Sequence, residues 1–177
     1  MLFLAVRPPD EIARRIVQAG IELCRQHRFA NAPFGAQWLH ISLLNFGDYA
    51  EFPRGHARLA RILASTIVAP RFNATFDRAM TFGGRSATAN KRPFVLVAPE
   101  GHGFSQLQHR LAAAVDVRRR VPFTPHITLL YDRSTVQATS IEPISWTVDE
   151  FVLIHAQVKQ PTQPKPPYSI IGRWGLL

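Results

Sequence analysis

Two nearly identical pentapeptides constrain the fold of this 177-residue chain more than any other feature. Residues 40–44 read His-Ile-Ser-Leu-Leu, and residues 126–130 read His-Ile-Thr-Leu-Leu. Both segments predict strands, on which side chains alternate between the two faces. We therefore expect each histidine to share a face with the hydroxyl residue two positions later. The apolar residues between them face the opposite side and can pack against a helix.

The first pentapeptide closes a predicted strand–helix–strand unit at the start of the chain. Residues 2–6 are apolar and read as a strand, and Asp10, which follows two prolines, reads as a helix cap. Apolar residues then recur at helical spacing through about Arg28. After a loop of small residues, residues 38–44 predict the strand that carries the first histidine.

The second pentapeptide closes a unit of the same kind. Residues 93–98 predict a buried strand, and residues 123–132 predict the strand that carries the second histidine. Between them one helical stripe is formed by Phe104, Leu107, Leu111 and Val115. The repeated order indicates an internal duplication, although the same order by chance in an α/β protein stays open as the alternative. In a duplicated fold, the two motif strands lie side by side and their histidines face one cavity.

The rest of the chain supplies the elements that complete such a fold. A helix that ends before Pro70 has an apolar side formed by Leu59, Ile62, Leu63 and Ile67. Residues 72–77 alternate as a half-buried strand does. Residues 144–158 and 168–177 predict two further strands, joined by a proline-rich loop over residues 161–167. No linker divides the chain, so we expect a single domain over residues 1–177.

Composition indicates a folded protein with an anionic partner. Hydrophobic residues make up 46% of the chain, and the formal net charge is +9, carried mainly by arginine. Arginine suits phosphate because its planar fork donates two hydrogen bonds to one anion, although genome base composition explains the excess of arginine equally well.

The first apolar run, residues 2–6, is too short for a signal peptide or a membrane span. Cys24 is the one cysteine. We therefore expect a cytoplasmic protein without disulfides or membrane association, and we favour a monomer.

Two facing imidazoles suit phosphoester hydrolysis without a metal. The attacking water must lose a proton while the leaving oxygen gains one, and one imidazole can do each job. Histidine titrates near pH 6.5 in the absence of perturbation, so a protonated and a neutral copy can coexist near neutrality. The hydroxyls of Ser42 and Thr128 are placed to hydrogen-bond the non-bridging phosphate oxygens. The alternative is that these two residues are ordinary strand residues.

The chain resembles the bacterial and archaeal 2′-5′ RNA ligase family, also called RNA 2′,3′-cyclic phosphodiesterases, within the two-histidine phosphoesterase superfamily. The resemblance spans almost the whole length. It is carried by residues 2–6 with Pro8-Pro9, the first motif running into Gly47-Asp48, residues 123–129, residues 151–154, and residues 168–176.

This resemblance implies an α+β, bilobal, duplicated fold, with two antiparallel-rich sheets around a central cleft and helices outside. It implies hydrolysis of a 2′,3′-cyclic phosphate to a 2′-phosphate without a cofactor or metal, on RNA ends or small cyclic-phosphate nucleotides. His40 is then the general acid that protonates the departing 3′ oxygen, and His126 is the base that activates water. Ser42 and Thr128 complete the catalytic set. The same pair can run 2′-5′ ligation in reverse.

One position departs from the family pattern. Tyr131 stands where related sequences often carry an arginine after the second motif. Arg133 or the arginines at 118–120 are candidate replacements for binding phosphate, and Tyr131 and Phe123 are candidates for stacking on a base. The alternatives are that the arginines only solvate a loop and that Phe123 packs in the core. His155 is a further candidate for the cleft, or else a satisfied strand residue.

Two other functions fit the same sequence. The first is an RNA-binding module that keeps the fold but has lost efficient catalysis, as Tyr131 and the arginine excess allow. The second is a phosphodiesterase for another cyclic or 2′-5′ linked nucleotide. A zinc site is not expected, because neither motif has the clustered ligands that zinc requires.

Overall fold

The computed structural model describes residues 1–83, 91–98, 101–115, 123–157 and 168–177. Within these residues the chain forms eight strands, three α-helices and one short 3₁₀ helix, η1. In chain order the elements are β1 (Leu2–Val6), α1 (Asp10–His27), η1 (Ala36–Trp38), β2 (Ile41–Gly47), α2 (Arg54–Ser65), β3 (Phe72–Thr81), β4 (Arg92–Val97), α3 (His102–Ala114), β5 (His126–Asp132), β6 (Thr139–Val148), β7 (Glu150–His155) and β8 (Ser169–Gly175).

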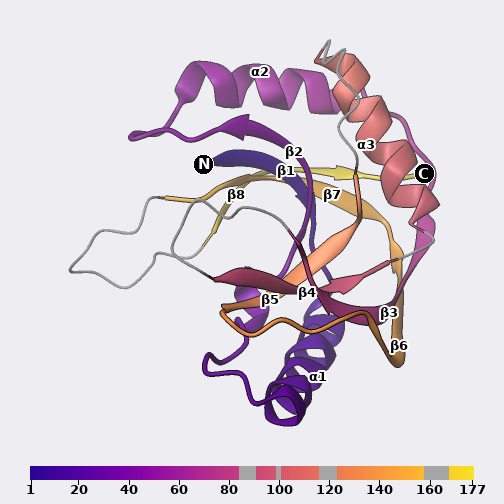
Figure 1. The fold of residues 1–177 in the computed structure, drawn as a ribbon. Coiled ribbons are helices and arrows are strands. Elements are labelled where there is room, and N and C mark those ends of the chain that lie inside the picture. The colour runs from indigo at the N-terminus through magenta and orange to yellow at the C-terminus, as the bar shows by residue number, and fades with distance from the viewer. Residues whose placement is uncertain (84–90, 99–100, 116–122, 158–167) are drawn as a thin grey trace.

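The strands form two four-stranded sheets (Figure 1). The first has the order β2-β1-β7-β8 and the second has the order β5-β4-β3-β6, with antiparallel pairing throughout. In each sheet the strand that carries a histidine motif lies at the edge and pairs with the strand that begins its unit. The expected α+β fold with two antiparallel sheets is therefore confirmed.

Helices that connect strands of one sheet also contact the other sheet. Helix α1 connects two strands of the first sheet but contacts β6 of the second, and α3 connects two strands of the second sheet but contacts β2 of the first. In Figure 1, α2 and α3 lie above the first sheet and α1 lies below the second. One apolar cluster contains buried residues of both sheets, including Leu4, Phe76, Leu96 and Leu153. This shared core fixes the position of β2 relative to β5.

The first helix begins differently from our expectation. Pro9 occupies the cap position, no side chain caps the helix, and Asp10 is the first helical residue. The fixed φ of proline suits a helix start, and the Asp10 carboxylate in the first turn is favourable beside the positive end of the helix dipole. The helix ends where Arg28 adopts a left-handed conformation, with a φ of 55°.

Two strand predictions are corrected by the structure. The predicted strand over residues 38–44 begins only at Ile41, because Trp38 donates a backbone hydrogen bond to Gly35 in a 3₁₀ turn. The predicted strand over residues 144–158 is two strands that meet at Asp149. They separate because β6 pairs with β3 in the second sheet whereas β7 pairs with β1 in the first. The proline-rich loop at 161–167 lies outside the described residues.

The apolar side predicted for α2 is only partly right: Leu63 is half-buried and Ile67, just after the helix, packs against the core. Leu59 and Ile62 are 55% and 54% exposed, whereas the buried face consists of Ala57, Ala60 and Ala64. These alanines are three and four residues apart, so they form one stripe along the helix. Small side chains allow the helix axis to approach β8 and α3 closely, and Leu59 and Ile62 are turned towards solvent.

Candidate active site

One cavity of about 410 Å³ contains both histidine motifs. It lies where the edge strands β2 and β5 contact each other. Its lining comprises Met1, Phe34, Trp38, His40, Ser42, His126, Thr128, Tyr131 and Tyr168. The structure therefore places the two predicted histidines, their two hydroxyl partners and Tyr131 around the same space.

The alternation of side chains along each motif strand explains this arrangement. Ile41 and Leu43 are buried in the core on either side of the exposed Ser42. Ile127 and Leu129 are likewise fully buried, and Thr128 between them is half-buried. The apolar face of each strand anchors it to the shared core, so the opposite face presents an imidazole and a hydroxyl to the cavity.

The imidazoles are oriented by matching hydrogen bonds. His40 Nδ1 lies 2.9 Å from the carbonyl oxygen of Trp38, and His126 Nδ1 lies 2.7 Å from that of Thr124. A carbonyl oxygen only accepts hydrogen bonds, so both Nδ1 atoms must carry a proton. In each neutral ring, Nε2 is then the basic nitrogen, and it is also the atom that gains and loses the exchangeable proton.

Each carbonyl is held in place by the residue that follows it. Leu39, between Trp38 and His40, is fully buried, and Pro125, between Thr124 and His126, is buried as well. Pro125 also accepts a backbone hydrogen bond from Ala98 at 3.1 Å. Burial of the intervening residue fixes the backbone on which each imidazole depends.

Aromatic rings pack against both imidazoles. Phe3 on β1 lies 5.0 Å from His40, and Phe82 after β3 lies 4.8 Å from His126, measured between ring centroids. Tyr168 makes an edge contact with His40 at 5.4 Å. Burial is the main cause that raises the pKa of the Tyr168 phenol, and the nearby Tyr131 raises it further whereas Arg7 opposes the shift. Sequence reasoning missed the place of Tyr168 in this cavity wall.

Asp132, at the end of β5, is a structural residue that the sequence did not disclose. It is 3% exposed and accepts hydrogen bonds from the backbone N–H groups of Ala30, Asn31 and Ser134 and from the Asn31 side chain. The hydrogen bond from Ser134 and those from Asn31 and Ala30 outweigh burial and lower the pKa of Asp132 to about 2. An aspartate at a strand end gives no sequence signal of partners a hundred residues away.

Several residues that we considered for the site lie elsewhere. Phe123 and Arg133 do not line the cavity: Phe123 packs against the apolar core, and Arg133 is exposed. His155 is buried on β7, where its ring contacts Phe52 at 5.0 Å. The arginines at 118–120 lie outside the described residues.

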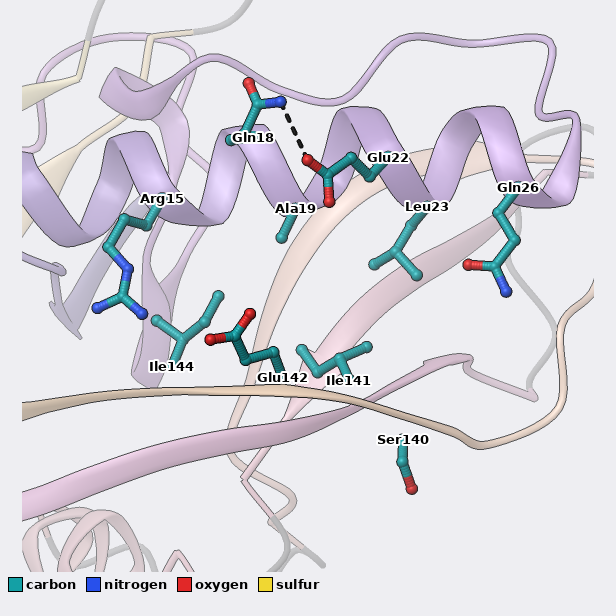
Figure 2. Close-up of a pocket in the computed structure, with 10 residues that line it drawn as sticks. All are labelled: Arg15, Gln18, Ala19, Glu22, Leu23, Gln26, Ser140, Ile141, Glu142 and Ile144. Atoms are coloured by element: carbon teal, nitrogen blue, oxygen red, sulfur yellow. Dashed lines mark hydrogen bonds between the residues drawn. The ribbon is translucent and has the colours of Figure 1, made fainter.

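A second hollow of about 380 Å³ lies between α1 and β6 (Figure 2). Its polar groups include Arg15, Glu22 and Glu142, and the Glu22 carboxylate accepts a hydrogen bond from Gln18. The described residues that line this hollow include no imidazole and no part of either motif. We therefore place the chemistry in the cavity between β2 and β5.

In the described part of the chain, no group of three or more histidine, cysteine or carboxylate side chains is arranged to hold a metal ion. None of the helices in that part is long and apolar enough to cross a membrane.

Comparison with known proteins agrees with this geometry. The family model of the 2′-5′ RNA ligase superfamily matches residues 8–160. Escherichia coli LigT complexed with 3′-AMP is 29% identical, with a TM-score of 0.70, over 99% of this chain and 96% of LigT. A structure described as a phosphoesterase is 26% identical, with a TM-score of 0.72, over 99% and 97% of the two chains. The protein TT0787 of Thermus thermophilus is 24% identical, with a TM-score of 0.70, over 98% and 96%. No curated protein matches significantly.

Two antiparallel sheets, each with a histidine motif on an edge strand, make this the two-histidine phosphoesterase fold. The chain belongs to the 2′-5′ RNA ligase superfamily, since the family model matches most of its length. Family and fold together indicate a phosphoesterase.

Proposed function

We propose that this protein hydrolyses the 2′,3′-cyclic phosphate of RNA ends or small nucleotides to a 2′-phosphate, without a metal ion. The observation that carries the proposal is the matched pair His40 and His126. Both line the same cavity, and each has its Nδ1 hydrogen-bonded to a backbone carbonyl. This arrangement supplies two Nε2 atoms to the two proton transfers that the reaction requires.

The reaction balances with one proton moving at each imidazole. The oxygen of water forms a bond to phosphorus as the bond from phosphorus to the 3′ oxygen breaks. Neutral His126 takes the proton that the water loses, and protonated His40 gives its proton to the departing 3′ oxygen. Exchange with solvent then restores the starting protonation states. Each such proton transfer contributes roughly 10²–10⁴-fold to the rate.

The hydroxyls of Ser42 and Thr128 hold the phosphate between the imidazoles. Each sits two residues after its histidine on the same strand face, so the four side chains surround one site. The hydroxyls donate hydrogen bonds to the non-bridging oxygens and keep the water, phosphorus and leaving oxygen in line.

The aromatic wall of the cavity suits a nucleoside. Tyr168 contacts Trp38 edge to face at 5.0 Å, and Tyr131, which is 45% exposed, contacts Phe34 at 6.1 Å. Nucleobases stack on such rings with little dependence on sequence. Structures of E. coli LigT contain 3′-AMP, ATP and NADP⁺, which supports a nucleotide as the ligand class.

The proposal is tested with adenosine 2′,3′-cyclic phosphate and a short RNA that ends in a cyclic phosphate, both with a chelator present. We expect turnover to adenosine 2′-phosphate, separated from the 3′-isomer by chromatography. His40→Ala and His126→Ala should each lower kcat/KM by roughly 10²–10⁴-fold. His109→Ala, on the exposed side of α3, is the matched control and should retain full activity.

Three results would overturn the proposal. They are turnover only after metal is added, a 3′-phosphate product, or unchanged activity in both cavity variants. RNA binding without any product would instead favour the RNA-binding module.

A further inference from the structure

Arg7 directly follows β1, the strand that pairs with the strand of the first motif. Ala5 pairs with Ser42 across the antiparallel strands, so the two residues share a face. Arg7 follows Ala5 by two residues, one residue past the end of β1, so continued strand alternation would return its side chain to that face. The contact between Phe3 and His40 is on the same face, four residues before Arg7.

The guanidinium of Arg7 is partly buried, and its hydrogen bonding is incomplete. Among the described residues its Nε atom is buried and has no partner, and it forms no ion pair with a carboxylate. Its one side-chain hydrogen bond to another described residue, from Nη2 to the carbonyl oxygen of Gln37, is exposed and long at 3.5 Å. A buried charged donor without a partner is costly, and an anionic ligand would remove that cost.

Arg7 also lies beside the cavity wall. Its positive charge acts on the phenol of Tyr168, which lines the cavity and contacts His40. Gln37 belongs to η1, the element that leads into the first motif. Arg7 is not itself among the lining residues, and it lies next to the end of the cavity that is formed by Trp38 and Tyr168.

We propose that Arg7 binds a second phosphate of the substrate, one nucleotide position away from the phosphate held by the histidines. Ala5 lies opposite Ser42, and Arg7 lies two residues further along the extended chain, a spacing of about 7 Å that is comparable to one nucleotide step. The inference rests on the proposed function and narrows it: substrates with a 5′-phosphate, as in an RNA chain, are preferred over bare nucleoside cyclic phosphates.

Calorimetric binding at one salt concentration tests this without any turnover. The ligands are adenosine 2′-monophosphate and adenosine 2′,5′-bisphosphate, which differ only in the second phosphate. The full-length protein should bind the bisphosphate about 10- to 100-fold more tightly, as expected for one hydrogen-bonded ion pair. Arg7→Gln should remove most of this preference, and Arg7→Lys should retain part of it.

Arg14→Gln is the matched control, because Arg14 is exposed on α1. This substitution changes the net charge by the same amount as Arg7→Gln. It should keep the wild-type preference. The inference is overturned if the wild-type protein shows no preference, if Arg7→Gln keeps it, or if Arg7→Gln weakens both ligands equally. The last result would place Arg7 on the reacting phosphate. Failure of cyclic-phosphate hydrolysis would appear in the turnover assay and not in this comparison.

Discussion

Asp132 accepts hydrogen bonds from both the backbone N–H and the side-chain amide of Asn31, at 3.1 and 2.9 Å. Asn31 belongs to the loop before the first motif, whereas Asp132 ends the strand of the second. Phe34 in the same loop donates a 2.7 Å backbone hydrogen bond to Leu129. The loop that leads to His40 is therefore attached directly to the strand that carries His126.

Asp132→Asn should weaken this attachment. The variant keeps the size of the side chain but loses the charge that accepts four hydrogen bonds. We expect a loss of about 1–3 kcal/mol in the free energy of unfolding at pH 7, measured in urea. Asp149→Asn, on an exposed turn, is the control and should change stability by less than about 0.5 kcal/mol.

The stability difference between wild type and Asp132→Asn should depend on pH. Because folding lowers the pKa of Asp132 to about 2, its charge stabilises the fold above the pKa of the unfolded chain. That contribution disappears as pH falls from about 4 through 2. The stability difference between wild type and Asp132→Asn should therefore shrink over this interval. A difference that stays constant from pH 7 to pH 2 would contradict the assignment.

The motif hydroxyls should affect binding of the phosphate more than folding. Ser42→Ala and Thr128→Ala each remove one donor to an anionic ligand, so we expect kcat/KM to fall by about 10- to 100-fold. Ser42→Thr restores the hydroxyl and should recover most of the activity. Equal activity in Ser42→Ala and Ser42→Thr would show that the hydroxyl does not contact the reacting group.

His155 should make the fold sensitive to mild acid. Burial, followed by repulsion from the N-terminal ammonium group, lowers the pKa of its imidazole in the folded protein. The unfolded chain then binds the proton more readily, so stability falls as pH drops below about 6.5. His155→Phe should lose less stability between pH 7.5 and 5 than wild type does, by urea unfolding. A steeper decline in the variant would contradict this view.

The sequence was most informative where a pattern was repeated. The doubled motif, with buried Ile41 and Ile127 beneath it, predicted that its two histidines and two hydroxyl residues line one cavity, but Phe123 and Arg133 do not line it. The predicted strand began three residues too early and included His40, because the 3₁₀ turn before Ile41 depends on a backbone hydrogen bond that composition does not disclose. Asp132 was missed because its partners Ala30 and Asn31 are distant in sequence.

Helix α2 shows the limit of reading hydrophobicity alone. Leu59 and Ile62 are apolar at helical spacing, yet they are exposed because the alanine stripe fits closer to the first sheet. Ala60→Leu should overpack that interface and cost about 1–3 kcal/mol in unfolding free energy. Ile62→Ser should change stability by less than about 0.5 kcal/mol. The reverse order in thermal or urea unfolding would contradict the observed helix orientation.

The central claim is that His40 and His126 act as an acid and base pair. Its most direct test is the pH dependence of kcat/KM for adenosine 2′,3′-cyclic phosphate with a chelator present. One imidazole must be protonated and the other neutral, so we predict a bell-shaped profile in the wild-type protein. His40→Ala and His126→Ala should each lose one limb of the bell together with most of the activity. A wild-type profile with a single limb, or variants that keep both limbs, would contradict the account.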